Sequence, residues 1–157
     1  MINKIESRID ETIDGHLKDR VSCECFAKAF SGFYPIEFLS RSYYVVVEQI
    51  PKPDFPELRQ AGLGDLIDRP LSGITYKDTY FIKKGCESDL VLHFHELVHV
   101  AQWQVLGPSN FITRYISEVQ QQGYEDAPLE KMAYGLQNVF SKKSFPFNVP
   151  NYVRDNI

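Results

Sequence analysis

The chain has 157 residues, the length of one ordinary domain, and a globular composition of 43% hydrophobic and 24% charged residues. At this length a core forms without help from disulfides or metals. The 17 basic and 21 acidic residues give a net charge of −4, without the basic excess that nucleic acids and anionic membranes attract. We therefore expect a folded protein with neither of these partners, whose oligomeric state the composition does not predict.

The cysteines and the N-terminal residues indicate a cellular compartment. Cys23, Cys25 and Cys86 are an odd number with no disulfide pattern, which is typical of a reducing environment. The first residues mix charges into their pattern and lack the apolar stretch of a secretory signal. Apolar runs such as Tyr43–Val47 are too short to span a bilayer. These features predict a cytoplasmic protein.

The first half of the chain mixes helix, strand and loop patterns. Isoleucines at helical spacing predict an amphipathic helix over residues 2–20, and a shorter helical pattern follows at Cys23–Phe30. The β-branched and aromatic run Tyr43–Val47 predicts a buried strand. Residues 51–73 contain seven prolines and glycines and predict a loop with one short helix. Residues 74–83 alternate, which predicts an edge strand with one solvated face.

The second half is predicted to be helical. Ser88 is a candidate cap for a helix over residues 89–106, which Gly107 and Pro108 end. Further helices are expected over residues 110–122 and 128–140. Two prolines in Phe145–Tyr152 exclude a long helix there. We predict one domain spanning residues 1–157, with residues from about 144 to 157 as an extended tail.

The predicted helix at residues 89–106 contains the sequence His95-Glu96-Leu97-Val98-His99. Residues four apart lie about 40° apart on a helix, so both imidazoles can reach one metal ion at about 2.0–2.1 Å. Glu96 projects beside that ion, where it can take a proton from an activated water that attacks a carbonyl. The competing explanation is two histidines packed in a core, but buried histidines need polar partners. We interpret His93 as a hydrogen-bonded bystander.

This motif and the later segment Gly123–Tyr134 resemble zincin metallopeptidases of the gluzincin kind, in particular small bacterial single-domain members. The metzincin continuation is missing because His99 is the last histidine. The resemblance implies an α+β, zincin-like fold with a small mixed or antiparallel sheet, an N-terminal helix, an active-site helix and C-terminal helices. It also implies zinc-dependent hydrolysis of peptide bonds in a peptide or protein substrate, with Glu96 as the catalytic general base.

The gluzincin resemblance implies a third zinc ligand from a glutamate on a later helix. Glu118 has a suitable spacing, but an ion pair with Arg114 four residues earlier explains it without a metal. Glu130 has no such basic neighbour and lies in the first turn of its helix, where a carboxylate is favoured. Glu125 and Asp126 are further alternatives. We expect one Zn²⁺ per chain, held by the two motif histidines and Glu130.

Other parts of such a site stay open at this stage. The resemblance implies that the strand at residues 74–82 holds an extended substrate by β-addition, although an ordinary edge strand is an equal alternative. Tyr115, Tyr124, Tyr134 and Arg114 are all candidate donors to a developing oxyanion. The residues do not decide between them.

Two alternatives to a general peptidase are retained. The first is a latent or catalytically silent zinc- and peptide-binding module, whose cleft the apolar segment Phe145–Tyr152 closes. The second is a regulatory protease that cleaves a repressor, because the Glu130-x-x-Ala133 pattern also resembles such proteins.

Overall fold

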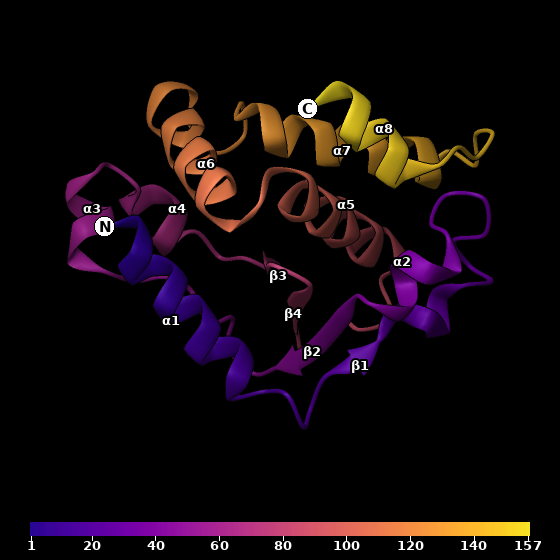
Figure 1. Cartoon of the computed structure of the whole chain (residues 1–157), viewed down its shortest axis with the longest axis horizontal. Helices are drawn as coiled ribbons and strands as arrows, with labels where there is room; N and C mark the ends of the chain where they lie inside the picture. Colours follow the sequence, from indigo (N-terminus) through magenta and orange to yellow (C-terminus); the bar gives the residue numbers. More distant parts are fainter.

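A long buried helix, α5 (Leu90–Leu106), runs through the centre of the molecule, between a small sheet and two C-terminal helices (Figure 1). The computed structural model describes all 157 residues. The remaining elements are α1 (Ile2–Asp14), β1 (Val21–Ser22), η1 (Cys23–Phe26), α2 (Ile36–Ser40), β2 (Tyr43–Val47), α3 (Pro56–Gln60), α4 (Gly64–Asp68), β3 (Gly73–Tyr76), β4 (Thr79–Lys83), α6 (Pro108–Gln122), α7 (Pro128–Ser141) and α8 (Val149–Asn156). None of the helices combines the length and the apolarity needed to cross a membrane.

The four strands form a mixed sheet in the order β1-β2-β4-β3. β2 and β4 run parallel, whereas the β1–β2 and β3–β4 pairs are antiparallel. The α+β class and the small mixed sheet are therefore as predicted. β3 has a neighbour on one side only, so it is the open edge nearest to α5.

The single strand predicted over residues 74–83 is wrong, because this segment is a hairpin. Tyr76 pairs with Thr79 across a two-residue turn in which Lys77 has a φ of 59°. No glycine or proline marks the turn, and the alternating pattern runs straight through it. The predicted solvated face is also wrong. Tyr80 faces the core beneath α5, and Phe81 faces a second core on the other side of the sheet.

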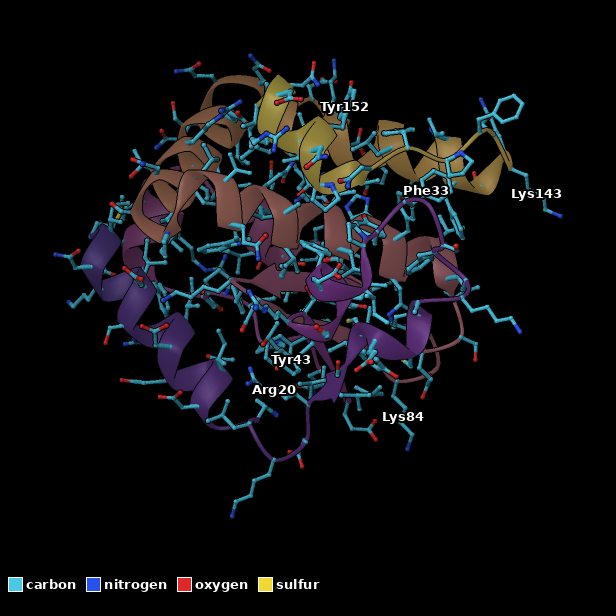
Figure 2. The ribbon with its side chains drawn as sticks, turned by 45° about the vertical axis from the view of Figure 1, so that its right-hand side comes forward. Arg20, Phe33, Tyr43, Lys84, Lys143 and Tyr152 are labelled. Atoms are coloured by element: carbon cyan, nitrogen blue, oxygen red, sulfur yellow. The ribbon has the colours of Figure 1, made fainter.

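The N-terminal helix is shorter than predicted. α1 ends at Asp14, and Gly15, a weak helix former, follows it. The chain then turns toward the sheet, where the Arg20 guanidinium lies 3.8 Å from the centre of the Tyr43 ring (Figure 2). The helical pattern at Cys23–Phe30 becomes the 3₁₀ helix η1 followed by turns.

Two other segments are more helical than expected. Residues 51–73 contain two short helices, α3 and α4, instead of one. The tail is not extended but forms α8, an eight-residue helix that the side chain of Asn148 caps. Pro150 is tolerated there because it stands in the first turn, where its missing N–H has no partner to lose.

Two hydrophobic cores lie on opposite faces of the sheet. The first joins α5 to the aromatic segment before β2 and to α7 and α8. The second joins α1, the α3–α4 segment and α6 to the other face of the sheet. α5 contributes to both, and eleven successive residues from His93 to Trp103 are buried. A helix covered on all sides is a rigid carrier for a functional site.

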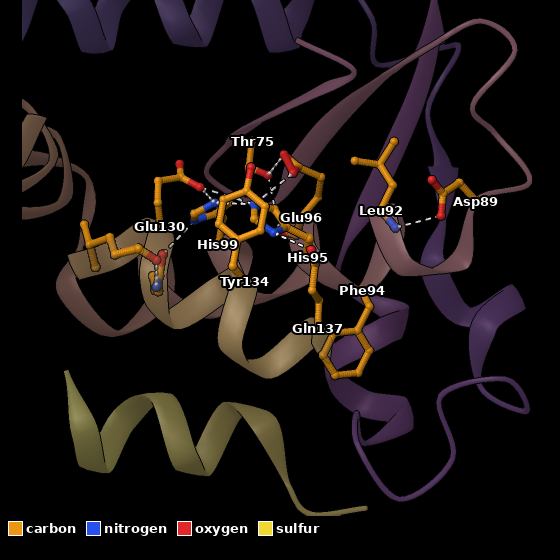
Figure 3. A network of polar contacts seen from close by, with 12 residues as sticks. Thr75, Asp89, Leu92, Phe94, His95, Glu96, His99, Glu130, Tyr134 and Gln137 are labelled. Atoms are coloured by element: carbon orange, nitrogen blue, oxygen red, sulfur yellow. Dashed lines mark hydrogen bonds and ion pairs between the residues drawn. The ribbon is translucent and has the colours of Figure 1, made fainter. Parts of the chain in front are cut away.

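The ends of α5 follow from local chemistry. Asp89, and not the predicted Ser88, caps the helix by accepting a hydrogen bond from the N–H of Leu92 at 3.2 Å (Figure 3). Gly107 ends the helix with a φ of 79°, which a glycine adopts without strain.

Candidate metal centre

Three side-chain atoms converge between α5 and α7 (Figure 3). The Nε2 atoms of His95 and His99 lie 3.2 Å apart, and Glu130 Oε1 lies 3.3 Å from the first and 3.1 Å from the second. Tetrahedral zinc with bonds of about 2.0–2.1 Å places its donors roughly 3.3–3.4 Å from one another. The triangle therefore already has nearly the dimensions of a metal site.

Two glutamines orient the imidazoles. Gln102 donates its amide N–H to the carbonyl of Leu129 at 3.0 Å, so its Oε1 must accept from His99 Nδ1, at 2.7 Å. Gln137 Oε1 lies 2.9 Å from His95 Nδ1 (Figure 3). With both Nδ1 protons donated outward, the neutral imidazoles present their Nε2 lone pairs to the centre, as metal-ligating histidines do.

Three acceptor atoms, the two Nε2 atoms and Glu130 Oε1, face one another, so a proton or a metal ion must lie between them. All three residues are 4–5% exposed, so water does not screen them. Burial disfavours the imidazolium, but the carboxylate of Glu130 outweighs it and raises the pKa of His99 to about 9. Burial likewise opposes ionisation of Glu130, but the two histidines hold the pKa of this carboxyl well below its usual range. This buried group can bind a metal ion, and a proton on His99 is the competitor.

Glu130 reaches the histidines from the first turn of α7. Tyr115 Oη donates to Glu130 Oε2 at 2.6 Å, which leaves Oε1 to face the imidazoles. Glu118, the rival candidate, has a different role. Its Oε1 accepts from the N–H of Leu129 at 2.9 Å and its Oε2 accepts from Arg114 Nε at 2.9 Å. Glu118 thus caps the helix that carries Glu130.

The remaining acidic candidates lie outside the centre. Glu125 pairs with Arg69 at 3.3 Å, and Asp126 lies 3.7 Å from Lys131. Both carboxylates are largely exposed. The structure therefore brings together His95, His99 and Glu130 and leaves the three other acidic candidates apart.

Glu96 lies beside this centre and points toward the edge strand. Thr75 Oγ1 on β3 donates to Glu96, with Oε1 at 3.1 Å and the carbonyl oxygen at 3.2 Å as its two acceptors, and Glu96 Oε2 is 3.8 Å from His95 Nε2. Burial raises the pKa of Glu96 above its ordinary value, although the nearby histidines and Thr75 oppose the shift. A carboxylate whose pKa is shifted toward neutrality is a better proton acceptor and donor.

The structure narrows the candidate oxyanion donors. The Tyr115 hydroxyl is engaged by Glu130, and Arg114 binds Glu118 and the carbonyl of Ile157. Tyr124 and Tyr134 remain, with hydroxyls 3.3 Å apart beside the metal centre. The Tyr134 ring centre lies 4.5 Å from that of His95.

Two hollows adjoin the centre. An apolar cavity lies toward α1, α4 and α6, and a polar cleft opens between β3 and α7. Both include His95 and Glu96 in their walls. No residue beyond Gln137 lines either of them, so the segment Phe145–Tyr152, whose closure of the cleft was one of the alternatives, does not close it. The tail packs elsewhere, with Val149 N–H bound to the carbonyl of Phe33 at 2.8 Å.

His93 is a bystander, as expected. Its ring nitrogens lie 2.7 Å from Tyr80 Oη and 2.9 Å from the carbonyl of Glu87. Sequence reasoning missed Thr75, Gln102 and Gln137. Gln102 stands three residues after His99 on the same helix, and this spacing was the only sequence signal for any of the three.

Comparison of the chain with models of known protein families, with curated proteins and with solved structures returned no match.

Proposed function

We propose that this chain is a zinc-dependent metallopeptidase in which His95, His99 and Glu130 hold one Zn²⁺ and Glu96 is the general base. The observation that carries the proposal is the donor triangle with a buried carboxylate beside it. Two imidazoles and one carboxylate are a donor set typical of catalytic zinc, which keeps its fourth position open, whereas structural zinc takes four protein ligands.

A bound Zn²⁺ would supply Lewis acidity, which activates water and polarises a carbonyl group. Glu96 would accept the proton of the attacking water at its carboxylate and deliver it to the leaving amine. Thr75 would fix one oxygen of this carboxylate through its hydrogen bond at 3.1 Å. Gln102 and Gln137 would hold the imidazoles in the tautomer that can bind metal.

The open edge of β3 supports a peptide as the substrate. The Lys83 N–H donates to the carbonyl of Ser72, so in the alternating antiparallel pattern the backbone groups of Gly73 and Thr75 point away from β4. These groups can pair with an extended chain laid along the edge. Thr75 also contacts Glu96, so such a chain would pass next to the proposed base.

Substitution of the proposed base tests this function. Glu96→Gln preserves the shape of the side chain but removes its proton-accepting charge, so hydrolysis of a mixed peptide library should fall by at least a hundredfold while zinc stays bound. The matched control is Glu48→Gln, an exposed carboxylate paired with Lys84, which should retain full activity. Hydrolysis that survives Glu96→Gln would overturn the mechanism.

A further inference from the structure

An apolar cavity lies beside the candidate metal centre. It has a volume of about 110 Å³, and 15 of its 23 lining residues are hydrophobic. The lining away from the metal comes from α1, α4 and α6 and from the loop before α4, and includes Ile5, Ile9, Leu63, Leu66, Ile67 and Ile112. This volume is smaller than the roughly 300–1,000 Å³ of a whole small-molecule site but close to the roughly 150 Å³ of a cavity that binds benzene, so it suits one large apolar group.

The two hollows differ in chemistry. The polar cleft contains Arg69, Ser72 and Asp89 among its lining residues, and 5 of its 13 lining residues are hydrophobic. The apolar cavity has the metal donors in one wall and mostly aliphatic and aromatic side chains in the others, with Lys52 as the one lysine or arginine of its lining. A group that fills it gains free energy by leaving water, and a charged group would lose its hydration there. The cavity thus selects an aliphatic or aromatic group next to the metal.

The strand β3 indicates which part of a peptide would enter the cavity. Along this segment, Ile74, Thr75 and Tyr76 line only the apolar cavity, residues 69, 70 and 72 line only the polar cleft, and Leu71 and Gly73 line both. Antiparallel pairing is the more stable arrangement per residue. A peptide paired antiparallel to β3 has its earlier residues at the Tyr76 end, beside the cavity.

We infer that the apolar cavity is a specificity pocket for a large apolar side chain on the acyl side of the hydrolysed bond. This inference rests on the proposed function, and it names the substrate class: peptides with a large aliphatic or aromatic residue directly before the cleaved bond. The polar cleft receives the substrate residues that follow the hydrolysed bond, on its amine side.

A binding experiment tests the pocket without requiring hydrolysis. The dissociation constants of acetohydroxamate and hexanohydroxamate, which bind zinc through the same head group, are measured by calorimetry on the zinc-loaded full chain. Four added methylenes, at about fourfold each, should tighten binding by about two orders of magnitude. Leu66→Trp should remove at least tenfold of this gain and leave acetohydroxamate binding unchanged.

The control is Leu106→Trp. Leu66 and Leu106 are both partly buried against the same core, but only Leu66 lines the cavity. Leu106→Trp should retain the full difference in affinity between hexanohydroxamate and acetohydroxamate. Equal affinities for the two hydroxamates, or a gain that persists in Leu66→Trp, would overturn the pocket.

Peptide cleavage separates the pocket from the proposed activity. Cleavage after leucine or phenylalanine should exceed cleavage after alanine at least tenfold. A preference on the amine side instead would overturn the assignment. Tighter binding of hexanohydroxamate than of acetohydroxamate, without any hydrolysis, would support the pocket and contradict the peptidase activity. Hydrolysis without this difference in affinity would support the activity and contradict the pocket.

Discussion

At the scale of single residues, the proposed site depends on side chains that hold the candidate ligands. Gln102 is fully buried and joins His99 to the backbone of α7 through two hydrogen bonds. It therefore fixes both the tautomer of one donor and the position of the helix that carries Glu130. Tyr115 does the same for the carboxylate, because it occupies the oxygen that faces away from the histidines.

The Gln102→Leu substitution should weaken zinc binding. His99 Nδ1 and the carbonyl of Leu129 would both lose their partner, and loss of such outer contacts commonly costs 10–100-fold in metal affinity. Competition with a chelating dye measures the effect. Gln104→Leu on the exposed side of the same helix is the control and should bind zinc as the wild type does. Equal affinity in the two variants would contradict the role of Gln102.

At the scale of elements, α8 is a structural part of the first core and not a plug. Val149 and Val153 are fully buried, and Arg114 donates to the carbonyl of Ile157 at 2.9 Å. Since α8 lines neither hollow at the metal centre, removing it should destabilise the protein without exposing the site.

The Val153→Ala substitution tests this assignment. Loss of two buried methylene equivalents should lower the free energy of unfolding by about 2 kcal/mol, as measured by urea denaturation. Val105→Ala, at a valine that is 40% exposed, should change it by less than about 0.5 kcal/mol. Truncation after Ser144 that left the free energy of unfolding unchanged and raised hydrolysis would contradict this assignment. It would indicate that the tail inhibits the site.

The α3–α4 segment, which walls the apolar cavity, carries on its exposed side an ion-pair clamp made of Arg59, Asp54 and Asp68. Arg59 on α3 binds Asp54 at 2.8 Å and Asp68 with two hydrogen bonds of 2.8 and 3.0 Å. Hydrogen bonds to Arg59 lower the pKa of both aspartates below their ordinary value of 3.8. The clamp therefore contributes its stability above pH 3.8 and loses it as the pH falls through the lower pKa of the folded state.

Acid should loosen this segment before the rest of the protein. All three groups are exposed, so the effect is modest and local. Hydrogen exchange, corrected for its intrinsic pH dependence, should show α3–α4 losing protection below about pH 4 while α5 keeps it. In Arg59→Gln the segment should already be less protected at pH 6. The same pH response in both proteins would contradict the clamp.

At the scale of the whole molecule, local sequence patterns predicted most of the helices and strands. They did not predict structure that depends on contacts between residues far apart in the sequence. The β2 strand and helices α5 to α7 followed from the periodicity and boundary residues of their own segments. The β3–β4 hairpin was missed because its turn, Lys77 and Asp78, contains neither glycine nor proline. The α8 helix was missed because its stability comes from burial against α5, which an eight-residue helix cannot supply alone.

The candidate site likewise contains residues that local sequence patterns predicted and residues that they did not. The two histidines and Glu96 could be predicted from helical spacing, because all three lie on one helix. Glu130 stood out by its lack of a local ion pair, and the structure places it against the histidines. Thr75 and Gln137 reach the site from other elements, 21 and 42 residues away from their partners. No local pattern marks such contacts.

We propose above all that His95, His99 and Glu130 form a metal site. Zinc content by mass spectrometry on the purified chain tests it most directly, with Glu130→Gln compared with Glu118→Gln. Both variants exchange one buried or half-buried glutamate for glutamine, but only Glu130 faces the histidines. We predict one zinc per chain in the wild type and in Glu118→Gln, and little or none in Glu130→Gln. No zinc in the wild type after reconstitution, or loss only in Glu118→Gln, would contradict the claim.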